Sequence, residues 1–395
     1  MLSSTLTETP PHFFNAMIRI KSDRIVLTDS LFDGYVYIEN GKILELSKEE
    51  KAADEAYDFT GKYVAPGFIE IHCHGGAGCE FAGSAEDIVN AANFHFEHGT
   101  TSICPTISAA PFATMTKAID SFEKALESSD LKGTLIGLHF EGPYLSKNQV
   151  GGQNPDAITP PVKEEYEPLL REKGHLVARW SYAPENDFDG SFAKALSEAG
   201  VVPSAGHTDA IYPDMVRAFE SGCKLVTHLY SCTSTITRVG GFRKLGVLES
   251  AYLNDDMYVE IIADGKHLPP ELIRLILKIK GRGRVCLITD SLAVAGVAKD
   301  GEEVETLGTR FFVEDGVCKL LDKSAFAGSI ATADRLIRVL TKEVGASVID
   351  AVYMMTKVPA EVMGLKNKGL LKKGFDADIV VFDEDINIAK VFAAK

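Results

Sequence analysis

Residues 68–74 read Phe-Ile-Glu-Ile-His-Cys-His, a short apolar run that ends in two histidines. Four further apolar runs also end in a residue able to bind a metal: Leu138-His-Phe-Glu141, Ser204-Ala-Gly-His207, Leu225-Val-Thr-His228 and Leu287-Ile-Thr-Asp290. Barrel enzymes take their catalytic groups from the C-terminal ends of several different strands. The pattern therefore predicts a metal-dependent site at one end of a barrel.

Strand-like runs alternate with helical patterns from residue 66 onward. Helical patterns run from Ser84 to His98 and from Pro111 to Glu127, and Ser84 with Glu86 and Asp87 behind it is a typical helix start. The expected strands lie near residues 68–72, 101–106, 135–141, 178–183, 201–206, 224–228, 258–263 and 284–290. This alternation predicts an α/β fold, a (β/α)₈ TIM-like barrel.

Both ends of the chain have sequence patterns typical of short β-strands joined by turns. Residues 17–65 alternate short β-type runs with turns, among them Asn40-Gly41, which is a favourable hairpin turn. Residues 369–383 return to the same pattern after two further helical segments. We expect the two ends to pair into a small β-sandwich domain, contributed by residues 1–65 and 366–395, with the barrel in residues 66–365.

Composition excludes several classes of protein. The chain has 395 residues, of which 45% are apolar, enough for a full core. Its net charge of −15 argues against nucleic-acid binding, which needs a basic face. No run of ~18 uncharged apolar residues predicts a membrane span, and Met1–Pro10 lacks the features of a signal peptide, so a cytoplasmic location is expected. The seven scattered cysteines favour reduced thiols over a disulfide framework.

Each possible ligand also has a structural interpretation. Any single histidine of the set is more simply explained by hydrogen bonding in the core, and only the joint placement at strand ends favours metal binding. A buried Glu141 must be paired or metal-bound. Asp290 could instead cap a helix, because Ser291 and an Ala/Val run follow it. His139 shares a strand face with Glu141, and we expect it to orient a ligand from behind.

Several of these stretches together resemble a known family, the N-acetylglucosamine-6-phosphate deacetylases of the amidohydrolase superfamily. The matching stretches are Val64-Ala-Pro-Gly with the His72-Cys-His74 run, His139-Phe-Glu141-Gly-Pro-Tyr, Ala205-Gly-His207-Thr, Val226-Thr-His228-Leu-Tyr, Ile262-Ala-Asp-Gly-Lys-His267, Ile288-Thr-Asp290 and Ala327-Gly-Ser329. They span nearly the whole chain. The His-x-His pair alone would indicate only the superfamily.

The resemblance implies roles for particular residues. Glu141, His207 and His228 would hold the main divalent metal ion, and Asp290 would be the catalytic acid/base. His72 and His74 match those members that hold a second ion, so one or two ions per chain are expected. A mixed set of histidine and carboxylate ligands suits zinc or iron.

The implied reaction is hydrolysis of the N-acetyl group of N-acetylglucosamine 6-phosphate to glucosamine 6-phosphate and acetate, a step of amino-sugar catabolism. The divalent ion would lower the pKa of a water toward ~7. Asp290 would accept the water proton and pass it to the departing amine, and His267 with a nearby arginine would hold the substrate. A homodimer is also implied.

Three positions depart from the family pattern. Ser231-Cys232-Thr233 stands where the family usually has Asn-Ala-Met, in the loop that contacts the sugar phosphate. The phosphate-binding arginine best matches Arg243, with Arg238 as a competitor. Gln153 stands where many members have a substrate-binding histidine, and its amide can hydrogen-bond a sugar but cannot carry charge.

Two alternatives to this function remain open from the sequence. One is another amidohydrolase, either a deacetylase for the galactosamine epimer or a cyclic-amide hydrolase. The cyclic-amide enzymes usually bridge their metals with a modified lysine, whereas the equivalent strand here ends in Glu141. The other is a barrel that serves as a scaffold without catalysis. Such a protein would be expected to have lost metal ligands, and none is missing.

Overall fold

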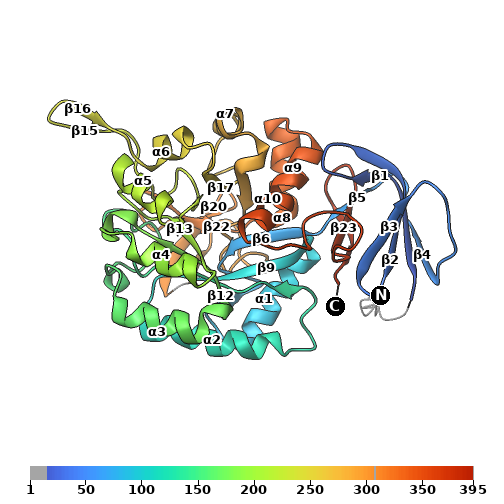
Figure 1. Ribbon diagram of the computed structural model, residues 1–395, viewed down its shortest axis with the longest axis horizontal. Coiled ribbons are helices and arrows are strands. Elements are labelled where there is room, and N and C mark those ends of the chain that lie inside the picture. Colours follow the sequence, from blue (N-terminus) through green and yellow to red (C-terminus); the bar gives the residue numbers. More distant parts are fainter. Residues whose placement is uncertain (1–15, 307, 395) are drawn as a thin grey trace.

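A nearly closed barrel of eight parallel strands forms the centre of the computed structural model, which describes residues 16–306 and 308–394 (Figure 1). In spatial order its strands are β6 (Phe68–Cys73), β9 (Thr100–Ile107), β11 (Leu138–Glu141), β12 (Val177–Tyr182), β13 (Val202–Ala205), β14 (Leu225–Val226), β17 (Tyr258–Ile262) and β18 (Val285–Ile288). A short β10 (Thr134–Leu135) pairs with β9 just before β11 begins. The predicted (β/α)₈ barrel and the positions of its eight strands are confirmed.

Side-chain and loop contacts join the first and last barrel strands at the end where the site lies. The Glu70 carboxylate of β6 accepts hydrogen bonds from the backbone N–H groups of His72 and Thr289, each at 2.8 Å. The N–H of Asp290 donates to the carbonyl oxygen of His72 at 3.0 Å. These contacts between β6 and the segment after β18 therefore fix two predicted site residues, His72 and Asp290, relative to each other.

Helices surround the barrel (Figure 1). The first, α1, begins at the cap residue Ser84, whose side chain accepts a hydrogen bond from Asp87 N while the Asp87 carboxylate binds Ser84 N, a reciprocal cap. The helices are α1 (Ala85–Glu97), α2 (Phe112–Leu126), α3 (Lys163–Lys173), α4 (Ser191–Glu198), α5 (Tyr212–Glu220), α6 (Val247–Leu253), α7 (Pro270–Lys280), α8 (Ala333–Val339), α9 (Val348–Met355) and α10 (Lys357–Val362). The first two agree with the helical patterns of the sequence.

The two ends of the chain meet in one seven-stranded sheet beside the barrel (Figure 1). Antiparallel pairing of β5 with β23 joins them, with Val64 opposite Val381. The strands are β1 (Ile18–Val26), β2 (Leu31–Glu39), β3 (Lys42–Ser47), β4 (Glu55–Asp58), β5 (Tyr63–Pro66), β23 (Ile379–Phe382) and β24 (Ile388–Phe392). Their inward side chains form an apolar cluster of their own. The expected β unit built from both termini is therefore present.

Besides a short pair formed by β7 (Gly75–Gly76) and β8 (Cys79–Glu80), two larger β elements were not expected from the sequence. A four-stranded antiparallel sheet follows β18 and consists of β19 (Glu303–Thr306), β20 (Thr309–Glu314), β21 (Val317–Leu320) and β22 (Phe326–Ser329). Its strands are only four to six residues long, so any alternation of apolar and polar residues along them is a weak signal. At its end, Ser329 N donates to the carbonyl oxygen of Asp290 at 2.9 Å, which attaches this sheet to the mouth of the barrel.

The second unexpected element is an exposed hairpin of β15 (Thr237–Val239) and β16 (Phe242–Lys244). Gly240 and Gly241 form its turn with positive φ angles of 56° and 88°, which glycine adopts without strain. The hairpin projects from the body of the molecule, at the upper left of Figure 1.

Some predictions concern regions or properties outside the barrel. Within residues 16–306 and 308–394, no helix is long and apolar enough to cross a membrane. All seven cysteines are free, as expected. The stretch Met1–Pro10, on which the prediction of a cytoplasmic location depends, lies outside the described residues.

Candidate metal centre and substrate pocket

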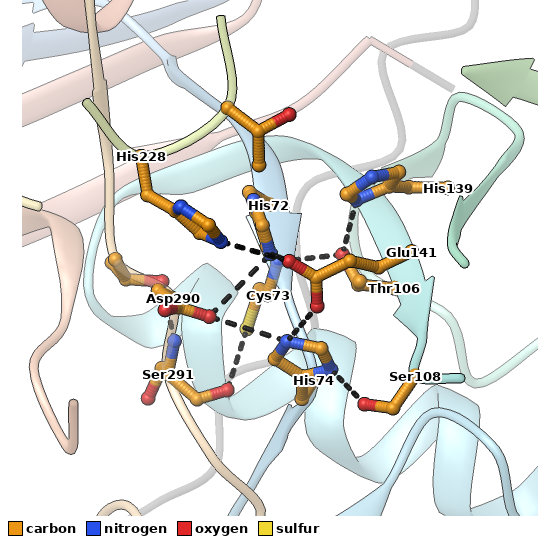
Figure 2. Close-up of polar contacts among 12 residues, drawn as sticks. His72, Cys73, His74, Thr106, Ser108, His139, Glu141, His228, Asp290 and Ser291 are labelled. Atoms are coloured by element: carbon orange, nitrogen blue, oxygen red, sulfur yellow. Dashed lines mark hydrogen bonds and ion pairs between the residues drawn. The ribbon is translucent and has the colours of Figure 1, made fainter. Parts of the chain in front are cut away.

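Six predicted site residues meet at the C-terminal end of the barrel, and Figure 2 shows five of them facing one another. Each comes from the end of a strand or the turn that follows it: His72 and His74 from β6, Glu141 from β11, His207 after β13, His228 after β14 and Asp290 after β18. Their ligand atoms form three overlapping groups, in each of which all atoms lie within 4.8 Å of one another. Residues up to 218 positions apart in the chain therefore share one small volume.

Glu141 lies at the centre of this cluster. Its Oε1 is 3.0 Å from His228 Nε2 and 3.2 Å from His207 Nε2. Its Oε2 is 3.3 Å from His74 Nε2. Oε1 also lies 3.3 Å from His72 Nε2, so this one buried carboxylate contacts all four histidines and could share them between metal ions.

The second ring nitrogen of each histidine has its own partner. His72 Nδ1 lies 3.3 Å from Glu260 Oε2, His74 Nδ1 2.9 Å from Ser108 Oγ, His207 Nδ1 2.8 Å from Gln149 O and His228 Nδ1 3.1 Å from Ser231 O. A hydrogen bond at Nδ1 sets the ring orientation and leaves Nε2 for a metal. All four Nε2 atoms are therefore turned toward Glu141.

The donor set fits a metal ion. His72 Nε2 is buried and has no hydrogen-bond partner, although it lies 3.3 Å from Glu141 Oε1 and 3.4 Å from Asp290 Oδ1. The Nε2 atoms of His207 and His228 are only 3.2 Å apart. Such convergence of imidazole nitrogens and carboxylate oxygens is typical of sites for first-row divalent ions.

The electrostatics of the cluster favour positive charge at its centre. Burial lowers the pKa of His72, but the carboxylates of Glu141 and Asp290 outweigh burial and raise it to about 10. Burial alone would raise the pKa values of Glu141 and Asp290, whereas the neighbouring histidines hold both below their ordinary values. Both carboxylates are therefore ionised at neutral pH, and a divalent cation is attracted by the same field that retains protons on the imidazoles.

Three of the six residues have positive φ angles, which residues other than glycine rarely adopt. His207, His228 and Asp290 have φ values of 46°, 29° and 49°. Non-glycine residues in this region cost free energy and cluster at functional sites. The chain turns sharply at these residues as it leaves β13, β14 and β18.

An open cavity of about 270 Å³ lies above the cluster. Its lining includes the loop Tyr230–Cys232, which contains the predicted substrate contacts Ser231 and Cys232, and residues 325–328 at β22. His267 also lines the cavity, and its Nδ1 is bound to the Asp264 carboxylate at 2.8 Å. The ring of Phe326 packs edge-on against the His267 imidazole, with centroids 4.9 Å apart.

Gln153 lines the same cavity, but both ends of its amide are already hydrogen-bonded. Its Nε2 donates to Glu141 Oε2 at 2.7 Å, and its Oε1 accepts from Ala109 N at 2.8 Å. In this geometry the side chain supports the central carboxylate directly.

The structure does not bring Arg238 or Arg243 to the cavity of their own chain. The two residues lie opposite each other in the exposed β15–β16 hairpin. Of the residues that the structure describes, those lining the cavity include no lysine or arginine. The reason is tertiary, because the long loop after β14 extends outward as a hairpin instead of folding over the barrel mouth.

Several residues at or below the site were not identified from the sequence. Phe326 directly precedes the Ala327-Gly-Ser329 stretch and lines the cavity. Arg179 and Glu260 are fully buried below the cluster. A charged residue inside an apolar strand run is itself an unusual signal that could have indicated both. His139, by contrast, was named from the sequence; its ring lies against that of His72, with centroids 4.6 Å apart, and its two ring nitrogens are bound to Thr106 and Ser181.

Comparisons with known proteins agree with this architecture. A model of the amidohydrolase family matches residues 63–395. The N-acetylglucosamine-6-phosphate deacetylase of Bacillus subtilis (strain 168) is 31% identical over 378 residues, which cover 93% of this chain and 94% of that protein. The protein of the same name from Lysinibacillus sphaericus is 29% identical over 369 residues, which cover 91% and 92%.

Solved structures give the same result at the level of the fold. A mutant of N-acetyl-D-glucosamine-6-phosphate deacetylase from Mycobacterium smegmatis, in complex with N-acetyl-D-glucosamine-6-phosphate, superposes with a TM-score of 0.88 and 26% identity. The match covers 96% of this chain and 98% of that one.

Proposed function

Because this chain belongs to the amidohydrolase family, we propose that it removes the acetyl group of N-acetylglucosamine 6-phosphate, releasing acetate and glucosamine 6-phosphate. The observation that carries the proposal is the convergence of four histidine Nε2 atoms on the Glu141 carboxylate, with Asp290 beside them at the floor of an open cavity. Relatives that match along most of their length are named as enzymes of this reaction.

The proposed metal sites divide the cluster in two. Glu141, His207 and His228 would hold the main ion, and His72 and His74 would hold a second ion on the other side of Glu141. Zinc and iron are the ions that this donor set suits best. A bound divalent ion supplies a Lewis acid that polarises the amide carbonyl and makes water more acidic.

Asp290 would move the proton. Its ionised carboxylate lies at the cavity floor, 3.2 Å from His74 Nε2. It accepts a proton from the attacking water as the new carbon–oxygen bond forms, and then donates that proton to the amide nitrogen as the carbon–nitrogen bond breaks. Proton transfer of this kind typically contributes roughly 10²–10⁴ in rate.

His267 would bind the substrate. The Asp264 carboxylate occupies its Nδ1 and holds the ring against the cavity wall. Its Nε2 is left to donate to the acetamido oxygen, where negative charge develops during hydrolysis. Ser231 and Cys232 line the cavity on the other side and would contact the sugar.

Phosphate recognition needs a cation that the cavity lining of one chain does not supply. We propose that the protein is a homodimer in which the β15–β16 hairpin of one copy lies beside the cavity of the other, so that Arg243 or Arg238 meets the phosphate. Val239 and Phe242 of this hairpin are 61% and 76% exposed. Contact with a second copy would bury these apolar side chains. A dianion approaching a protein of net charge −15 requires such a local cation.

Acetate release is the direct test of the proposed function. Purified protein loaded with zinc or iron should release acetate from N-acetylglucosamine 6-phosphate faster than from N-acetylgalactosamine 6-phosphate or unphosphorylated N-acetylglucosamine. The matched control is the metal-loaded Asp290→Asn protein. Hydrolysis of a cyclic amide such as dihydroorotate, without acetate release from any amino sugar, would contradict the proposal.

A further inference from the structure

A carboxylate and a guanidinium are buried inside the barrel directly below the metal centre. Glu260 on β17 and Arg179 on β12 are both 0% exposed, and Arg179 Nη1 donates to Glu260 Oε1. Burying an ion pair costs desolvation, and apolar replacements of similar size are often equally stable. The pair therefore calls for a role other than stability.

The other oxygen of Glu260 contacts both halves of the metal centre. Oε2 lies 3.3 Å from His72 Nδ1 and accepts a hydrogen bond from the backbone N–H of His228 at 3.2 Å. When Nδ1 of His72 donates to a carboxylate, the ring is fixed and Nε2 is directed at the centre. This is the same Nε2 that is buried without a hydrogen-bond partner beside Glu141 and Asp290.

Arg179 sets the orientation of Glu260. Besides Glu260, its Nη1 donates to Ile71 O at 3.0 Å, and its Nη2 donates to Ser204 Oγ at 3.1 Å and Thr227 Oγ1 at 3.2 Å. These contacts fasten the guanidinium to β6, β13 and the turn after β14. Because it occupies Oε1, only Oε2 is free to meet His72.

We propose that Glu260 is a positioning residue that presents Nε2 of His72 to a metal ion, and that Arg179 fixes Glu260 for this purpose. Neither residue lines the cavity, so neither touches substrate. The proposal rests on the proposed metal-dependent function. It places the effect on the ion bound by His72 and His74, since the rings of His207 and His228 are held by Gln149 O and Ser231 O.

A pair of double variants tests the positioning role. Arg179→Met with Glu260→Gln keeps a carbonyl oxygen that can accept from His72 Nδ1, whereas Arg179→Met with Glu260→Leu keeps none. Both remove the two buried charges together, so neither leaves an unpaired ion inside the barrel. The affinity for each zinc ion is measured by equilibrium dialysis at buffered free zinc, and folding is checked by circular dichroism of the metal-free proteins.

We expect the Leu variant to bind its weaker zinc ion roughly 10–100-fold less tightly than the parent. Removal of the hydrogen-bond partner of a metal-binding histidine typically has an effect of this size. The Gln variant should stay within a few-fold of the parent, and the tighter ion should remain in both. Equal affinities in the two variants would overturn the proposal, whether both are normal or both are weakened. A parent that binds one ion, with an affinity that His72→Ala does not change, would overturn it too.

This outcome is separable from the proposed reaction. If the Gln and Leu variants differ in zinc affinity as expected while the parent releases no acetate from any amino sugar phosphate, the positioning role stands and the proposed function fails. If the parent is an active deacetylase and the two variants bind zinc equally, the function stands and the positioning role fails.

Discussion

At the scale of single residues, Asp290 is held by its backbone as well as by its neighbours. Its N–H donates to His72 O at 3.0 Å, its carbonyl accepts from Ser329 N at 2.9 Å, and its left-handed φ turns the chain at this point. The carboxylate is therefore fixed relative to both β6 and β22, which suits a group that must meet water and the leaving nitrogen in one geometry.

Asp290→Asn should separate proton transfer from binding. The amide keeps the volume of the side chain but cannot shuttle a proton, so we expect kcat to fall by roughly 10²–10⁴. Metal content should remain near that of the parent, because His207, His228 and Glu141 are unchanged. Steady-state kinetics with metal analysis checks this, and turnover within a few-fold of the parent would assign the proton transfer elsewhere.

The proposed second ion depends on the His72/His74 pair. Changing both histidines to Ala should lower the saturating metal content by one ion per chain while the ion at Glu141, His207 and His228 remains. His228→Ala is the matched comparison and should instead weaken the main ion. Elemental analysis under saturating zinc measures both, and an unchanged count in the double variant would show that the pair has only a structural role.

Gln153 offers a test between two roles. Its amide bonds to Glu141 and Ala109, which indicates support of the central carboxylate. Gln153→Ala should then weaken metal binding by roughly 10–100-fold, measured by competition with a chelator. A raised KM with normal metal affinity would instead support the substrate contact that the sequence predicted.

At the scale of elements, the β15–β16 hairpin and the β19–β22 sheet are insertions at the same end of the barrel. The sheet region supplies residues 325–328 to the cavity lining, whereas the hairpin projects from the body of the molecule (Figure 1) and contributes no residue to that lining. In the proposed homodimer, the hairpin is therefore the element whose contribution would depend on a second copy of the chain.

Arg243→Ala should raise KM for N-acetylglucosamine 6-phosphate strongly while barely changing the slow hydrolysis of unphosphorylated N-acetylglucosamine. The reason is that a planar guanidinium binds phosphate through two hydrogen bonds as well as charge. Arg238→Ala, on the facing strand, is the matched variant. Equal and weak effects of both changes on both substrates would mean that these arginines are simply solvated surface residues.

At the scale of the whole molecule, the metal centre connects distant parts of the chain. The six residues of the candidate centre come from the ends of five strands, and contacts between β6 and the segment after β18 lie at the same end of the barrel. An ion bound at the proposed site would therefore crosslink the barrel mouth in the folded state.

Removal of metal should therefore destabilise the protein. A ligand that binds only the folded state adds about 2.7 kcal/mol to the free energy of unfolding when its free concentration is about 100 times its dissociation constant. We expect thermal unfolding of chelator-treated protein at a Tm several degrees lower, with recovery on adding zinc. The His207→Ala/His228→Ala protein is the control and should respond little to zinc; a Tm of the parent that does not depend on zinc would contradict the assignment of the centre.

The sequence by itself determined the barrel and most of its metal centre. Parallel strands in a barrel end at one rim, so a residue that ends an apolar run is placed at that rim before any contact is known. This is why His72, His74, Glu141, His207, His228 and Asp290 could all be predicted to meet. Similarly, short apolar β-type runs separated by turns at both ends of the chain were enough to predict that the two ends form a β unit together.

Only the tertiary structure decided how these residues are supported and how the insertions lie. Glu260 is 188 positions from His72 and 81 from Arg179, and such contacts exist only once the barrel has closed. The path of a loop likewise decides the hydrogen bond from Gln153 to Glu141. The position of Arg243 in an exposed hairpin also depends on how its loop folds. Periodicity predicts which face of a strand is buried, but the partner of a polar side chain on that face is set by packing between strands far apart in the chain.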